Sequence, residues 1–130
     1  MKKTYLILIV TLALLLIVIL LFLRGDEDSW IKNEKGIWIK HGNPSKIPDY
    51  VEEQKNLIQC ANNLYLEMKL SGINFNSQCL GKCIDYSVDI VNVPRIDEDN
   101  KLENQCIEFN EGLTKKFIEL DKYGEVVRII

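Results

Sequence analysis

Residues 5–23 read Tyr-Leu-Ile-Leu-Ile-Val-Thr-Leu-Ala-Leu-Leu-Leu-Ile-Val-Ile-Leu-Leu-Phe-Leu, without a charge, an amide or a glycine. In a helix, these nineteen residues span roughly 28 Å at about 1.5 Å each, close to the hydrocarbon thickness of a bilayer. Sixteen of them are Leu, Ile, Val or Phe, whose insertion free energies sum to about −6 kcal/mol. The stretch is therefore predicted to be a transmembrane helix, with the lipid bilayer as its partner.

The flanks of this stretch favour an uncleaved signal-anchor. Cleaved signal peptides have a shorter apolar core of about 7–15 residues and a small-x-small cleavage site, and Leu23-Arg24-Gly25-Asp26 has no such site. Lys2 and Lys3 precede the stretch and acidic residues follow it, so the positive-inside rule keeps the N-terminus in the cytoplasm. We therefore expect a cytoplasmic N-terminus at residues 1–4, a transmembrane signal-anchor at 5–23, a charged spacer at 24–29 and an extracytoplasmic domain at 30–130.

The rest of the chain is acidic. Residues 24–130 contain 14 basic and 19 acidic residues, a net charge of −5. This balance argues against a nucleic-acid surface and against a surface lying on anionic lipid. About a hundred residues fit one small domain, whose limited core benefits from cross-links.

Residues 30–70 predict a β-hairpin followed by a helix. The segments 30–32 and 37–40 alternate and are rich in β-formers, and Asn33-Glu34-Lys35-Gly36 suits a type I turn with a left-handed glycine. Residues 48–70 predict a helix that begins at Pro48 and ends before Gly72. Its expected apolar stripe consists of Tyr50, Leu57, Ile58, Ala61, Leu64, Tyr65 and Met68.

The C-terminal half predicts four short strands. Residues 73–82 read as irregular, and 84–93 as a half-buried strand with Ile84, Tyr86, Val88 and Ile90 on the buried face. Asp97-Glu98-Asp99-Asn100 is interpreted as a solvated tip, because it lacks the spacing of a calcium loop. The other expected strands are 104–109, 113–120 and 125–130.

Short connections between these strands favour antiparallel pairing. The predicted fold class is α+β: an N-terminal transmembrane helix, then a small domain with a β-hairpin and one long helix packed on a four-stranded antiparallel meander.

Cys60, Cys79, Cys83 and Cys106 are the residues whose chemistry is most informative. An even number of cysteines in a small domain of an oxidising compartment favours two structural disulfides. A zinc site would need two close cysteine pairs, and only Cys79/Cys83 qualifies. A redox centre at Cys79/Cys83 would depart from Cys-x-x-Cys at a helix start. Of the three connectivities, Cys60–Cys79 with Cys83–Cys106 is slightly preferred, because the loop after the helix can return along it.

Three segments carry a resemblance: Gly36-Ile-Trp-Ile-Lys-His-Gly42, the pairs Cys60-Ala61 and Leu64-Tyr65, and Cys79-Leu-Gly-Lys-Cys83. Together they resemble small single-pass membrane proteins of unassigned function predicted from archaeal genomes. The resemblance spans most of the part after the membrane segment. It implies a membrane-anchored protein and transfers no site residues.

The sequence favours a non-enzymatic, membrane-tethered module that binds a protein or an envelope component. His41 is the single histidine and lies in a Gly/Asn/Pro loop, which favours a solvated side chain. No catalytic residue, metal or cofactor is expected. Two alternatives stay open: a thiol-redox enzyme using Cys79/Cys83, and a subunit of a pilus-like or secretion assembly. Against the second, type IV pilins continue the membrane helix into an amphipathic one, whereas Gly25 and acidic residues intervene here.

Overall fold

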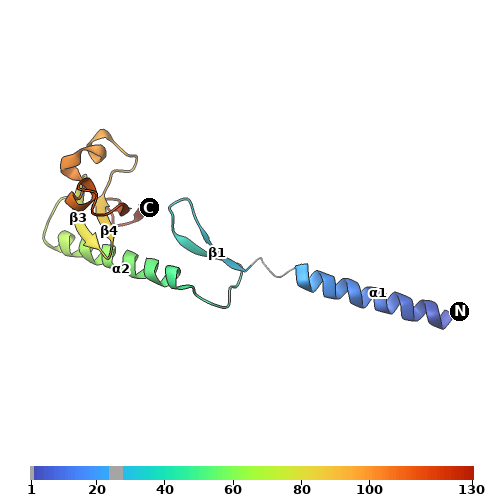
Figure 1. Ribbon diagram of the computed structural model, residues 1–130. Helices are drawn as coiled ribbons and strands as arrows, with labels where there is room; N and C mark the ends of the chain where they lie inside the picture. The colour runs from blue at the N-terminus through green and yellow to red at the C-terminus, as the bar shows by residue number, and fades with distance from the viewer. Residues whose placement is uncertain (1, 24–27) are drawn as a thin grey trace. The chain divides into compact units, whose positions relative to one another are not determined.

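The computed structural model describes residues 2–23 and 28–130 (Figure 1). The chain divides into two compact units, one of residues 1–30 and 40–45, the other of residues 31–39 and 46–130. The first unit contains the apolar N-terminal helix, and the second contains a long polar helix and a four-stranded sheet. The protein is therefore a mixed α+β protein, as the sequence predicts.

Helix α1 (Lys2–Leu23) is apolar on every side. Its large apolar side chains between Tyr5 and Leu21 are 47–68% exposed. The Thr11 hydroxyl donates to the Leu8 carbonyl (3.0 Å), so it is satisfied inside the helix. The segment Lys3–Leu21 is long and apolar enough to cross a membrane. Residues 24–27 of the predicted spacer lie outside the described residues, and Ser29 already belongs to the next strand.

Strands β1 (Ser29–Lys32) and β2 (Trp38–His41) form the predicted hairpin. The Asn33 carbonyl accepts the N–H of Gly36 (2.9 Å), and the Asn33 side-chain oxygen accepts the N–H groups of Lys35 and Ile37 (3.0 and 2.9 Å). Gly36 has φ 76°, the left-handed conformation expected of it. The turn also contacts the larger sheet, because the Ile129 N–H donates to the Lys35 carbonyl (2.8 Å).

Helix α2 (Asp49–Leu70) confirms the predicted long helix. Pro48 is its N-cap, and Gly72 has φ 77° just beyond its end. The buried residues are Val51, Leu57, Ala61 and Tyr65. Val51 was not expected in the stripe, and Tyr50 is 44% exposed.

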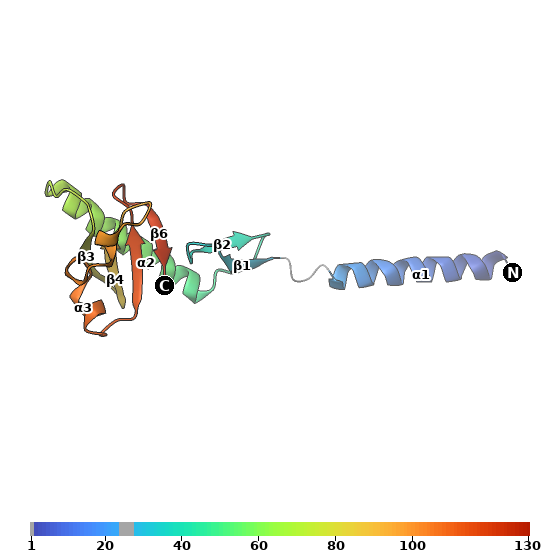
Figure 2. The ribbon, with the colours of Figure 1, turned by 90° about the horizontal axis from the view of Figure 1, so that it is seen from above.

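The larger sheet has the order β3-β4-β5-β6, with β3 at Gln78–Cys83, β4 at Tyr86–Ile90, β5 at Lys116–Leu120 and β6 at Val126–Ile129 (Figure 2). The outer pairs are antiparallel, but β4 and β5 are parallel. The predicted antiparallel meander is therefore wrong. A parallel pair needs a long crossover, and residues 91–115 form it.

The crossover explains two incorrect predictions. Residues 104–109 are not a strand: η2 (Leu102–Asn104) and the short helix α3 (Ile107–Asn110) occupy this stretch. Residues 97–100 form the 3₁₀ helix η1, and the prediction of a solvated tip holds for Asp97 and Asn100 but not for Asp99. Asp99 is 3% exposed there, because its carboxylate accepts hydrogen bonds from Asn92 and Ile96.

Strand β3 lies where the sequence reads as irregular. Gly81 interrupts its apolar pattern with φ 139°, and the register against β4 shifts between Cys79 and Gly81. Such a bulge places two residues of one strand opposite one residue of its partner and removes the simple alternation of faces. The sequence pattern of a strand is lost for this reason.

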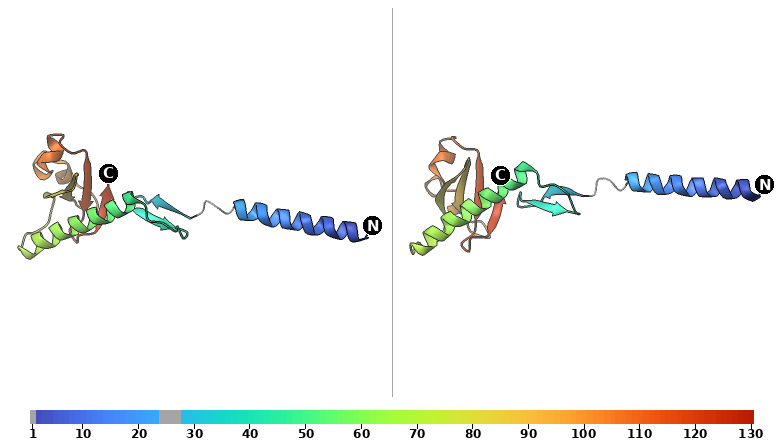
Figure 3. Two further views of the ribbon diagram at one scale, coloured as in Figure 1. Left: turned by 60° about the horizontal axis from the view of Figure 1, so that its bottom comes forward. Right: turned by 90° about the horizontal axis from the view of Figure 1, so that it is seen from below.

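The core of the second unit combines helix and sheet residues. Helix α2 runs alongside the four-stranded sheet (Figure 3). Leu57, Ala61 and Tyr65 of α2 belong to one buried cluster with Leu80, Val88, Ile90, Ile118, Leu120 and Ile129 of the sheet. Val88 and Ile90 are buried as predicted, whereas Ile84 is 60% exposed in the β3–β4 turn. Ser87, on the other face of β4, is also fully buried, so this central strand is covered on both faces.

We predict that Gly36→Ala lowers the free energy of unfolding by about 2–4 kcal/mol, whereas Gly72→Ala lowers it by about 1 kcal/mol. Both glycines have nearly the same positive φ, but a Cβ at position 36 would overlap the Ile129 carbonyl, and one at position 72 meets nothing. Urea unfolding of the full chain in detergent, followed by tryptophan fluorescence, measures both losses. Equal losses would contradict the contact between the hairpin turn and β6.

Candidate functional site

Two disulfides connect the four cysteines: Cys60–Cys83 and Cys79–Cys106. The first joins α2 to β3, and the second joins β3 to the residue that caps α3. Their Cα separations of 5.9 and 4.9 Å are those of ordinary native disulfides. The prediction of disulfide bonds is confirmed, but the preferred pairing of Cys60 with Cys79 and of Cys83 with Cys106 is wrong.

The β-bulge explains why the pairing differs. Without a bulge, Cys79 and Cys83 would point to the same face of β3, four residues apart. In the observed register Cys79 lies opposite Asp89, and Cys83 lies opposite Tyr86. Asp89 and Tyr86 are three residues apart and point to opposite faces of β4. Cys83 therefore shares a face with Tyr86 and reaches Cys60 of α2, while Cys79 shares the other face with Asp89.

This other face carries a row of reactive and charged side chains across all four strands. The register places Cys79 of β3 opposite Asp89 of β4, Asp89 opposite Glu119 of β5, and Glu119 opposite Arg128 of β6. Directly opposed residues in a sheet have neighbouring side chains on one face. The crossover contributes Cys106 to the same place, because Cys106 is bonded to Cys79.

Glu119 is a buried carboxylate whose charge is balanced. It is 3% exposed, and it forms ion pairs with Arg95 (2.8 Å) and Arg128 (2.5 Å). Arg128 binds both carboxylate oxygens and lies over the Phe117 ring, 4.9 Å from its centroid. The hydrogen bond to Glu119 raises the pKa of Arg128. These charge-assisted hydrogen bonds give both oxygens of the buried Glu119 carboxylate guanidinium partners.

Asp89 has a different environment from Glu119. One of its carboxylate oxygens, Oδ1, lies 3.1 Å from Sγ of Cys106, and among the described residues no basic side chain forms an ion pair with it. Burial, and then the negative charge of Glu119, raise the pKa of Asp89 to about 6, although the Cys106 N–H and Arg95 act in the opposite direction. A disulfide sulfur has no proton to donate, so this contact is favourable when the carboxyl group holds the proton.

A small cavity adjoins this row. Its volume is about 120 Å³, and its polar lining consists of Ser77, Asp89, Arg95, Asp99, Asn104, Gln105, Glu119 and Arg128. Ligand pockets usually have about 300–1,000 Å³, so this cavity has room for a few waters or a very small molecule. Burial alone would raise the pKa of Asp99 at its edge, but hydrogen bonds from Ile96 and Asn92 lower the pKa below its usual value.

A larger cleft of about 470 Å³ lies elsewhere in the second unit. The rings of Trp38 and Tyr50 line it at a centroid separation of 4.5 Å. The Gln54 side chain holds the backbone next to this wall, because it accepts a hydrogen bond from the backbone N–H of Trp38 (2.7 Å) and donates one to the Gly36 carbonyl (2.9 Å). The volume falls in the range of ligand pockets.

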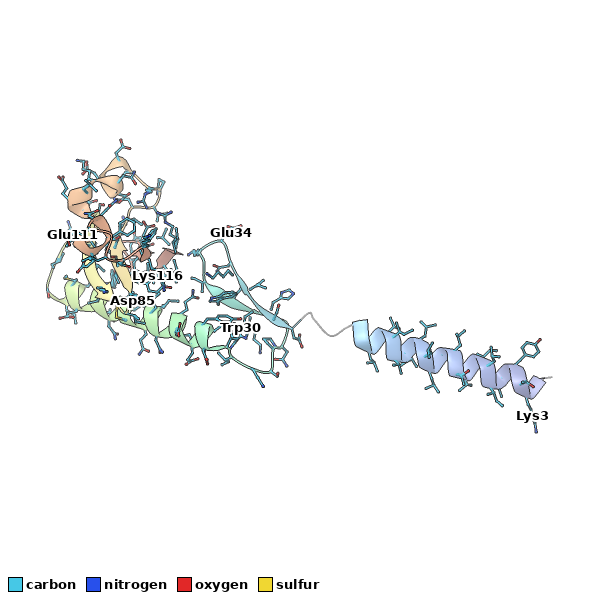
Figure 4. All side chains as sticks on the ribbon, viewed as in Figure 1. Lys3, Trp30, Glu34, Asp85, Glu111 and Lys116 are labelled. Carbon is cyan, nitrogen blue, oxygen red and sulfur yellow. A yellow bond between two sulfur atoms is a disulfide. The ribbon has the colours of Figure 1, made fainter. Side chains whose placement is uncertain are left out.

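The turn between β3 and β4 and the first residue of β5 also contribute to the cleft. Asp85, Tyr86 and Lys116 line it, and Figure 4 labels Asp85 and Lys116. The Lys116 ammonium lies 5.2 Å from the Tyr86 ring centroid. Ile84 also lines it and has φ 56°, a conformation that β-branched residues rarely adopt. Strain of this kind is often found at binding sites.

His41 and the Cys79/Cys83 pair, which the sequence offered as possible reactive residues, do not form a catalytic or metal site within the described residues. His41 is exposed at the end of β2 and lines neither cavity. Cys79 and Cys83 belong to different disulfides and do not form one redox pair. In the described part of the chain, Cys79, Cys106 and Asp89 are the group of metal-binding types whose ligand atoms lie within 4.8 Å of one another. Both sulfurs are bonded to each other, so this group offers no thiolate to a zinc ion.

The alternation of residues 84–93 predicts that Asp89 lies on the solvated face of the strand. Its alternation with Asp85 and Ser87 gave no sign that a crossover covers this face. Comparisons with protein-family models, curated proteins and solved structures found no match.

We predict that Asp89→Asn stabilises the protein above pH 6 by up to about 3 kcal/mol. The native Asp89 keeps its proton up to a pH of about 6, the value of its raised pKa, whereas the unfolded chain releases it near the ordinary aspartate pKa of 3.8. The native state therefore binds more protons between these values. Stability from this group is full below pH 3.8 and is lost as the pH rises through 6.

Denaturant unfolding at pH 5 and pH 8 measures this effect. The wild type should lose stability between the two pH values relative to Asp89→Asn, and the exposed Asp85→Asn should behave as the wild type. A variant that is less stable than the wild type at pH 8 would contradict a raised pKa.

We also predict that each disulfide contributes about 3 kcal/mol to stability through loop closure. The sequence separations of 23 and 27 residues are nearly equal, so Cys60→Ser with Cys83→Ser and Cys79→Ser with Cys106→Ser should lower the free energy of unfolding by similar amounts. Thermal melts with and without reductant provide the check. Identical melting temperatures would contradict a structural role for the bridges.

Proposed function

We propose that this protein is a membrane-anchored extracytoplasmic binding module. Residues 5–23 span the bilayer, residues 1–4 stay in the cytoplasm, and the domain of residues 30–130 faces outside. The exposed apolar surface of α1 supports insertion. Lys2 and Lys3 against the acidic residues 26–28 support the orientation. Two disulfides support an oxidising compartment.

The 470 Å³ cleft is the observation that carries the binding role. It combines the aromatic wall of Trp38 and Tyr50 with positively charged lysines and negatively charged carboxylates. Aromatic residues at a concave site supply most of the binding energy, and the polar groups around them set the orientation of the ligand. We infer that the ligand is an extended segment of an extracytoplasmic protein, whose side chains of mixed charge match this lining.

The pilus-like alternative has less support. Helix α1 ends at Leu23, and the next described element is strand β1 at Ser29–Lys32. An assembly helix of the pilin type would continue as an amphipathic helix.

Protease treatment of intact cells tests the orientation. We expect the domain after residue 29 to be digested without permeabilisation, while a tag before Lys2 stays protected. Digestion of the tag and protection of the domain would reverse the proposed topology.

Photocrosslinking tests the cleft. A photoreactive phenylalanine replacing Tyr50, which is 44% exposed in the cleft, should form a defined adduct in native membranes. The same substitution at Tyr123, which is 71% exposed and outside the cleft, is the matched control and should form none. Trp38→Ala should reduce the adduct about tenfold, the loss expected for a central aromatic residue. Equal adducts at both positions, or none at Tyr50, would contradict the proposal.

A further inference from the structure

The two disulfides of this protein have different surroundings. Asp89 Oδ1 lies 3.1 Å from Sγ of Cys106. Among the described residues, the sulfurs of one bridge, Cys79–Cys106, form a close group with a carboxylate, and those of Cys60–Cys83 do not. A carboxyl group beside a disulfide is a potential proton donor to the sulfur that leaves when the bridge is reduced.

The exposure of the two sulfur-bearing residues determines the direction of reaction. Cys79 is partly exposed, whereas Cys106 is completely buried. We expect an external thiolate to attack the sulfur of Cys79, because Cys79 is the more exposed residue of this bridge, so that the Cys106 sulfur becomes the leaving group. A thiolate formed at this buried position would lack hydration, so its departure requires a proton.

We propose that Cys79–Cys106 is an exchangeable disulfide, in which Asp89 passes a proton to the Cys106 sulfur as an external thiol attacks Cys79. This site is separate from the cleft and does not depend on the binding role.

The atoms and electrons of the exchange balance with a thiol as co-reactant. The thiolate of an external cysteine attacks Sγ of Cys79 and forms a mixed disulfide. The Cys79–Cys106 bond breaks, and its electron pair goes to Sγ of Cys106. That sulfur takes the proton of the Asp89 carboxyl group, which leaves a Cys106 thiol and an Asp89 carboxylate. In the reverse direction, the carboxylate removes the thiol proton, and the bridge reforms.

The charges facing Asp89 allow it to act as an acid near neutral pH. Glu119 of β5 is the neighbouring negative charge, Arg95 of the crossover is the neighbouring positive charge, and burial raises the pKa of Asp89 to about 6. Arg128 of β6 is bound to Glu119 and does not pair with Asp89. Asp99 lines the same cavity, where its carboxylate is occupied by the hydrogen bonds of Asn92 and Ile96.

The reduced state also has a place for the new thiol. Sγ of Cys106 lies 3.5 Å from the Gly81 carbonyl and 3.6 Å from the Val88 carbonyl, so a thiol there can donate to either oxygen or to Asp89. Cys60–Cys83 keeps α2 joined to β3 when Cys79–Cys106 opens. The exchange therefore removes the covalent link between β3 and the crossover, while the link between β3 and α2 in the core remains.

Reduction of the full chain in detergent by glutathione between pH 5 and pH 8 tests the proposal. Free thiols are alkylated at each time, and mass spectrometry assigns the rate to each bridge. Rates are divided by the thiolate concentration to remove the titration of glutathione itself. For Cys79–Cys106 of the wild type, we expect this rate constant to fall roughly tenfold or more as the pH rises through about 6.

Asp89→Asn should abolish the pH-dependent step and lower the rate at pH 5 by a similar factor. Cys60–Cys83 is the internal control: it should react more slowly, show no step and behave alike in both proteins, which also reports that the variant is folded. Glu119→Gln is a second variant, expected to move the midpoint to lower pH because it removes the like charge beside Asp89.

A further measurement identifies the attacked sulfur. With Cys106→Ser, oxidised glutathione should convert the Cys79 thiol into a stable mixed disulfide and release one reduced glutathione, whereas with Cys79→Ser the buried Cys106 thiol should stay unmodified. The proposal is overturned if Cys60–Cys83 is reduced first, if both bridges show the same pH dependence, or if Asp89→Asn leaves the profile of Cys79–Cys106 unchanged.

Discussion

The β-bulge between Cys79 and Gly81 is the constraint on which the arrangement of this domain depends. It sends the two cysteines of one strand to opposite faces of the sheet, so each disulfide fixes a different layer. Cys83 joins the sheet to α2 on the face that carries the apolar core. Cys79 joins it to the crossover on the face that carries Asp89 and Glu119. Moving the register by one residue would exchange these faces and separate both pairs.

Two neighbouring carboxylates on that face, Glu119 and Asp89, have different partners. Glu119 has two guanidinium partners, whereas Asp89 is largely removed from water and lies beside a carboxylate and a disulfide sulfur. Adjacent buried carboxylates with one set of cations cannot both be ionised cheaply. The arginines pair with Glu119 and not with Asp89, and Asp89 keeps its proton up to a pH of about 6. The proton donor beside the disulfide is therefore a consequence of how the cations are distributed.

Local features of this fold can be predicted from sequence, and non-local ones cannot. The hairpin turn follows from Asn33 and Gly36, and the bounds of α2 follow from Pro48 and Gly72, because each depends on a few adjacent residues. The parallel β4–β5 pair depends on the crossover of residues 91–115, whose sequence pattern does not reveal that it packs on the sheet. The bulge that sets the disulfide pairing lies in a short Cys-Leu-Gly-Lys-Cys segment without alternation, so neither the pairing nor the role of Asp89 follows from the pattern.

The crossover is held by several contacts of different chemistry, which bears on what breaking one of them does. Arg95 pairs with Glu119, the Asp99 carboxylate closes the turn at Ile96, and the Thr114 hydroxyl donates to the Asp85 carbonyl. These contacts remain in the native state when Cys79–Cys106 opens, so the crossover is still held to the sheet. Opening this bridge is therefore a local event, whereas Cys60–Cys83 connects the elements of the core itself.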